Sequence, residues 1–121
     1  MRLVAAFRST ALLVVAAIPL PAIGQAVKIV GIGATPCTTF LQQAAADPRT
    51  GREYMAWAQG YLSGLLIRAP EGKDESLDLT PASFPVRKQA EFLRVYCETN
   101  RDADFGDAVE NLYKTLRAPP G

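Results

Sequence analysis

A chain of 121 residues, 49% of them hydrophobic, has room for one small domain and no more. Its formal net charge is only +1 and its basic residues form no stripe, which argues against nucleic acid or an anionic membrane surface as the main partner. It contains no histidine, so the commonest general base and most zinc sites are excluded. We therefore predict no catalytic residue, cofactor or metal.

Residues 1–26 have the features of a secretory signal peptide: a basic head, an apolar run, and small residues before a cleavage site. These features are Arg2 and Arg8, then Ala11–Ile18, then Pro19 and Pro21, then Ala22, Gly24 and Ala26. Cleavage after Gly24 or after Ala26 fits equally well. A membrane anchor is the alternative, but the run is shorter than the ~20 residues of a spanning helix and two prolines interrupt it. We expect an exported, periplasmic protein without stable membrane association after cleavage.

The chain has two cysteines, Cys37 and Cys97. Because exported proteins meet an oxidising compartment, we expect them to form one disulfide. A reactive or metal-binding thiol pair is the alternative, although no histidine or further cysteine could complete a zinc site.

Residues 27–34 are predicted to be an extended N-terminal segment, followed by a helical domain over residues 35–118. The first helix should begin at Thr35-Pro36, with threonine as cap and proline at the first helical position, and end at Asp47-Pro48. One face of this helix is apolar at helical spacing: Cys37, Phe40, Leu41, Ala44 and Ala45.

The central helix should run from Thr50 to about Arg68. Thr50 and Glu53 form a capping-box pattern. An apolar stripe then recurs at steps of three and four: Tyr54, Trp57, Ala58, Tyr61, Leu62 and Leu65. Trp57, Tyr61, Leu62 and Leu65 are our candidates for an apolar interaction surface that is masked at neutral pH.

Gly60 and Gly64 lie four residues apart on a neighbouring strip of the central helix. Each interior glycine costs about 1 kcal/mol relative to alanine. Their presence predicts that another backbone packs closely against the strip, either within the domain or from a subunit or partner.

The remaining elements are a long polar loop at Glu71–Pro85, a third helix over Pro85–Thr99 and a fourth helix capped by Asp104. The loop is expected to cover the domain, with one turn near Thr80–Ser83. The third helix should bury Val86, Ala90, Leu93 and Cys97. The fourth has an unbroken apolar pattern: Phe105, Ala108, Val109, Leu112, Tyr113 and Leu116. Residues 119–121 form a tail. The fold class is thus an all-α, small four-helix bundle tied by one disulfide.

Four short motifs, in this order, resemble the HdeA/HdeB-like family of small exported helical proteins. They are CTTFL at Cys37–Leu41, WAQGY at Trp57–Tyr61, YCETN at Tyr96–Asn100 and ADFGDAV at Ala103–Val109. The resemblance implies a periplasmic helical domain with a Cys37–Cys97 disulfide. In the acid-stress members it also implies an ATP-independent chaperone that dissociates and partly unfolds in acid to hold client proteins. The chain departs from the family pattern in the Glu71–Pro85 insertion and in the Gly60/Gly64 pair.

We therefore expect a small periplasmic protein-binding domain, with acid-stress holdase chaperoning as the leading specific function and a homodimer as one assembly to test. Without histidine, an acid response would have to come from carboxylates that titrate near pH 4. One alternative is an immunity protein that binds one secreted toxin or enzyme, since such proteins share the Gly-Tyr-x-x-Gly pattern of Gly60 to Gly64. Another is a structural periplasmic protein. The expected partners are a folded protein or unfolded clients.

Overall fold

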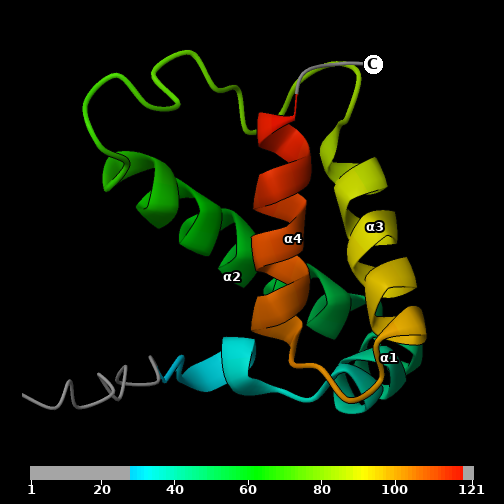
Figure 1. Ribbon diagram of the computed structural model, residues 1–121. Helices are drawn as coiled ribbons and strands as arrows, with labels where there is room; N and C mark the ends of the chain where they lie inside the picture. The colour runs from blue at the N-terminus through cyan, green and yellow to red at the C-terminus, as the bar shows by residue number, and fades with distance from the viewer. Residues whose placement is uncertain (1–27, 119–121) are drawn as a thin grey trace, which may run out of the picture.

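A computed structural model describes residues 28–118, and within that range every regular element is helical (Figure 1). The elements are a 3₁₀ helix η1 (Gly31–Ala34), α1 (Cys37–Ala46), α2 (Pro48–Ile67), α3 (Val86–Thr99) and α4 (Phe105–Arg117). The prediction of an all-α fold with four α-helices is confirmed. The predicted signal peptide, its cleavage site and the tail lie outside the described residues. Within residues 28–118, no helix is both long enough and apolar enough to cross a membrane.

Side-chain caps explain where α2 and α4 begin. The prediction that Thr35 caps the first helix is wrong, because α1 begins at Cys37 and Pro36 is its N-cap residue. The Asp47 carboxylate accepts a hydrogen bond from the Arg49 backbone N–H at 2.9 Å, so α2 begins at Pro48. The prediction that Thr50 caps this helix is wrong, because Asp47 provides the capping oxygen and the proline after it suits the first helical position. By contrast, α4 begins where predicted, with a reciprocal capping box between Asp104 and Asp107.

The N-terminal segment packs into the fold. The prediction of an extended segment is wrong for Gly31–Ala34, which form η1 against α2 and α4. A Cβ atom on Gly33 would lie 2.3 Å from the Trp57 ring, and one on Gly106 would lie 3.0 Å from the Gly33 carbonyl oxygen. The close backbone approach in this domain therefore occurs at Gly33 and Gly106.

The core is built around α4, which stands between α2 and α3 in Figure 1. Its buried side chains are Phe105, Ala108, Val109, Leu112 and Tyr113. Phe105 meets Phe40 of α1 and Tyr54 of α2, with ring centroids 4.6 and 4.9 Å apart. Such tilted and edge-on aromatic contacts add to the energy of apolar burial.

Cys37 and Cys97 form the predicted disulfide, with their Cα atoms 4.9 Å apart. Both residues are fully buried. The bond joins the first turn of α1 to the last turn of α3 and closes a loop of 60 positions. Two backbone hydrogen bonds next to it, Cys37 N–H to the Ala103 carbonyl and Phe105 N–H to the Thr35 carbonyl, tie the starts of α1 and α4 together.

The long loop between α2 and α3 is anchored at two points. Asp74 accepts hydrogen bonds from the Tyr113 hydroxyl and from Arg117, both at 2.8 Å. Further along the chain, the Gln89 amide donates to the carbonyl oxygens of Leu79 and Phe84. The turn expected near Thr80–Ser83 is present, closed by a bond from the Phe84 N–H to the Pro81 carbonyl. The polar composition of the loop therefore does not prevent it from being tied to α3 and α4.

Candidate binding groove

The four predicted surface residues of α2 pack within the fold. Leu62 is buried, while Trp57, Tyr61 and Leu65 are half-buried. Trp57 packs against Gly33, and Tyr61 stacks on Trp57 with ring centroids 5.2 Å apart. The Tyr61 hydroxyl donates to Glu110 at 2.8 Å; burial, together with this carboxylate, raises the pKa of Tyr61 to about 12. A role for these side chains in binding a partner stays a prediction.

Gly60 and Gly64 lie on an exposed strip of α2. No atom beyond their own helix lies within 4 Å of a Cβ built on either glycine. The interpretation that another backbone of the same domain packs against them is wrong, because that face of α2 is turned away from η1, α1 and α4. Ile67, at the end of the same helix, is 81% exposed. The alternative, contact with a subunit or partner, stays a prediction.

On another side of α2 the structure contains a groove that was not predicted. It runs between α1 and the first half of α2 on one side and α3 on the other, with a volume of about 1000 Å³. It exists because α3 packs on α1 and α4, while α2 packs on α1, η1 and α4, so that the two longest helices diverge. Its larger apolar lining residues are Phe40, Leu41, Tyr54, Met55, Leu93 and Phe105.

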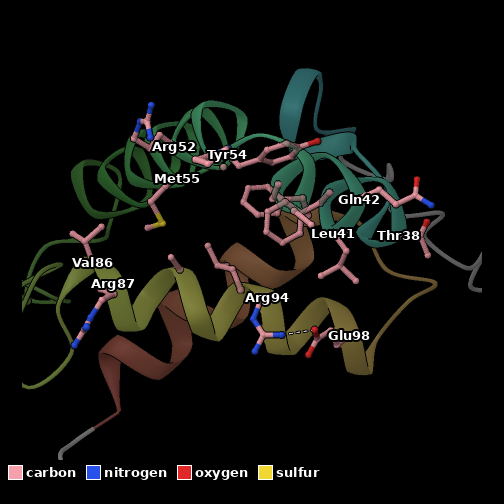
Figure 2. Close-up of a pocket in the computed structure, with 18 of the residues that line it drawn as sticks. Thr38, Leu41, Gln42, Arg52, Tyr54, Met55, Val86, Arg87, Arg94 and Glu98 are labelled. Carbon is pink, nitrogen blue, oxygen red and sulfur yellow. Dashed lines mark hydrogen bonds and ion pairs between the residues drawn. The ribbon is translucent and has the colours of Figure 1, made fainter.

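Figure 2 shows how side chains from the two sides enter this groove. Met55 points from α2 toward α3, and Leu41 points from α1 into the same space. Val86 stands at the start of α3, opposite Met55. Apolar side chains from three helices therefore face a common hollow, which no segment among residues 28–118 fills.

The exposure of α3 corrects one prediction. Val86 and Ala90 were expected to be buried with Leu93 and Cys97, but both are exposed and line the groove. Gln89 is fully buried instead. The loop before α3 covers the side of this helix that carries Gln89, whose amide binds two loop carbonyl groups. Nothing among residues 28–118 covers the side that carries Val86 and Ala90, so these apolar residues remain exposed.

Arginines provide most of the charge around the groove. Four of them line it, Arg52, Arg87, Arg94 and Arg101, together with a single acidic residue, Glu98. Arg94 pairs with Glu91 and Glu98 on its own helix, and the hydrogen bond to Glu91 raises the pKa of its guanidinium further. Within residues 28–118, the other three arginines form no ion pair or side-chain hydrogen bond.

The lining combines apolar walls with guanidinium groups. Apolar walls exclude water from a bound apolar group, and guanidinium groups at the edge accept carboxylates through several N–H donors. Among the described residues, no three cysteine or acidic side chains are grouped so that they could hold a metal ion.

Comparisons of the chain with protein-family models, with curated proteins and with solved structures find no match.

Proposed function

We propose that this protein is a small protein-binding domain that works outside the cytosol and receives an apolar segment of another protein in the groove between α1, α2 and α3. The observation that carries the proposal is a groove of about 1000 Å³ whose apolar lining comes from three helices, with Leu41 and Val86 at its open edge and buried core side chains at its floor. A preformed, largely apolar groove with a few charged groups at its edge is the usual form of a binding site.

An amphipathic helix is the segment that fits such a groove best. The wall formed by α3 is a single straight helix from Val86 to Glu98, about 18 Å long at the usual rise per residue. A helix laid alongside it would present apolar residues at steps of three and four along that length. The groove is present in the folded domain, and its floor is the buried core around Phe105, so binding in this manner requires no unfolding. A domain of this kind suits one folded partner, as in the toxin-neutralising alternative.

A steric block tests the groove. In Ala90→Trp the indole would occupy the hollow, whereas Val95→Trp places the same side chain on the outer face of α3, where Val95 is 45% exposed and does not line the groove. We expect Ala90→Trp to weaken binding of a fluorescent amphipathic helical peptide at least tenfold, and Val95→Trp to leave it unchanged. Equal binding by both variants, measured by fluorescence anisotropy, would exclude the groove as the binding site.

Acid-stress chaperoning is the second candidate, and one tether favours it. Asp74 holds the long loop to Tyr113 and Arg117. Protonation of Asp74 in strong acid would remove its charge and weaken its bonds to Tyr113 and Arg117, which would loosen the loop from α4. The resemblance to the HdeA/HdeB-like proteins points to the same function.

The acid-stress proposal has its own test. A holdase should suppress light scattering by an unrelated aggregating client near pH 3 and fail to do so at pH 7. If suppression is absent at pH 3, or equally strong at both values, acid-triggered chaperoning is excluded, while binding in the groove at neutral pH is unaffected.

A further inference from the structure

We infer that the segment received by the groove is an acidic amphipathic helix of a partner protein, with carboxylates at both ends of its apolar face. This inference rests on the proposed function, because it concerns the same groove and names the chemistry of its occupant. It is based on the charged residues around the groove, because an apolar lining alone does not distinguish an acidic partner helix from a basic one.

The charge of the groove differs from that of the molecule. The described residues contain 11 basic and 12 acidic side chains, so the domain as a whole is close to neutral. Four of the basic residues but only one of the acidic residues line the groove. A binding surface with this local excess attracts anionic segments and repels basic ones, which affects both the choice of partner and the rate of association.

The unpaired arginines are spread along the groove. Arg87 is the second residue of α3 and Arg101 lies two residues beyond its end at Thr99, so roughly the length of α3, about 20 Å, separates them. Arg52 lies on α2, on the opposite side of the groove. Three cations at separate places on the rim match a ligand that carries several separate anions.

This spacing distinguishes an acidic helix from a small anionic amphiphile. A fatty acid has one carboxylate and could pair with the arginine at one place only, which would leave the others without partners. A helix of about four turns spans the length of α3 and can present carboxylates near both ends and on one flank. Arginine binds carboxylates in bidentate geometry, so each such pair would also fix the register of the helix.

The central arginine is already neutralised. Arg94 lies seven residues after Arg87, about two turns along α3, and pairs with Glu91 and Glu98 (Figure 2). The partner helix therefore needs no carboxylate opposite the middle of the groove, where the apolar side chains of Met55 and Leu93 lie. The expected pattern is an apolar centre with acidic ends.

Three peptides test this inference on the oxidised protein. Each is a 16-residue amphipathic helix with the same leucine face, and its polar ends carry glutamate, glutamine or lysine. An exposed ion pair changes affinity by a factor of about 1.5 to 5, so three of them should make the glutamate peptide about tenfold tighter than the glutamine peptide. The lysine peptide should bind most weakly, and raising the salt concentration should reduce the differences.

Charge reversal provides the matched control. Arg52→Glu with Arg87→Glu should invert the order, so that the lysine peptide binds more tightly than the glutamate peptide. Arg68→Glu with Lys114→Glu makes the same change in net charge at exposed positions outside the groove, and should preserve the original order. Circular dichroism of both double variants shows whether the helical fold is retained.

The outcomes separate this inference from the proposed function. If all three peptides bind equally and Ala90→Trp blocks them, the groove binds helices but the acidic partner is excluded. If dodecanoate binds more tightly than the glutamate peptide and displaces it, the occupant is an amphiphile and the inference is overturned. If no peptide binds, or Ala90→Trp has no effect, the proposed function fails as well.

Discussion

Removing the Cys37–Cys97 disulfide should cost this domain a large share of its stability. In the loop-entropy account, a bond that closes 60 positions stabilises the folded state by about 4 kcal/mol. For a domain of about 90 residues the whole free energy of unfolding is about 5–13 kcal/mol. We expect the oxidised protein to unfold at a midpoint roughly 15–30 °C above that of the reduced protein.

Thermal unfolding of the oxidised and reduced chain, followed by circular dichroism, measures this difference without substituting any residue. The double variant Cys37→Ala with Cys97→Ala serves as a control, because its midpoint should not respond to reductant. The bond also holds α3 against α1 at one end of the groove, so reduction should weaken peptide binding before the helices melt. Equal midpoints for the oxidised and reduced protein would refute this reasoning.

Three further predictions concern single residues. Gly33→Ala should lose about 1–3 kcal/mol of unfolding free energy, because the new Cβ would overlap the Trp57 ring. Gly60→Ala should gain up to about 1 kcal/mol, because Gly60 lies in an open helical site. Equal effects of the two substitutions in chemical denaturation would contradict this. Asp74→Asn should unfold more easily than the parent at pH 7. Hydrogen bonds from Tyr113 and Arg117 lower the pKa of Asp74 below its usual 3.8. The stability difference between parent and variant should therefore be constant from pH 7 to about 5 and vanish as the pH falls through that lowered pKa. Asp102→Asn, at an exposed residue, is the control, and a stability difference for Asp74→Asn that persists at pH 2 would contradict the prediction. Gln89→Leu should loosen the loop, because the Leu79 and Phe84 carbonyls would lose their donor, and faster hydrogen exchange of the loop amides would reveal this.

The helices themselves could be predicted from local patterns. The apolar period of α4 and the cap at Asp104 predict both its buried face and its first residue, and the structure confirms both. The start of α2 was misplaced because Asp47 and Thr50 are both good caps, and the choice between them depends on Pro48, which suits the first helical position. Competition between nearby caps is hard to resolve from propensity alone.

The groove could not be predicted, because periodicity shows which face of a helix is apolar but not which neighbour covers it. Val86 and Ala90 belong to the apolar side of α3, as the pattern indicated, yet the divergence of α2 and α3 leaves them exposed. The burial of Gln89 could not be predicted from the pattern either. A glutamine is usually exposed, and its burial depends on the carbonyl groups of a loop that is close to it only in the folded chain.

The two glycines of α2 show a similar limit. A glycine within a helix can mark either close packing or open space, and both occur in this chain at different positions. Gly33 and Gly106 lie where backbones and rings approach closely, while Gly60 and Gly64 face outward. Only the folded arrangement distinguishes the two cases.

The most direct test of the central claim is a methyl NMR titration of the oxidised protein with the glutamate-ended helical peptide. The Met55 and Val86 methyl groups line the groove, whereas those of Val95 lie on the outer face of α3 and Ile67 lies at the exposed end of α2. Binding in the groove predicts large shifts at Met55 and Val86 and none at Val95 or Ile67. Shifts confined to Ile67, or no saturable shift at Met55 and Val86, would contradict the account.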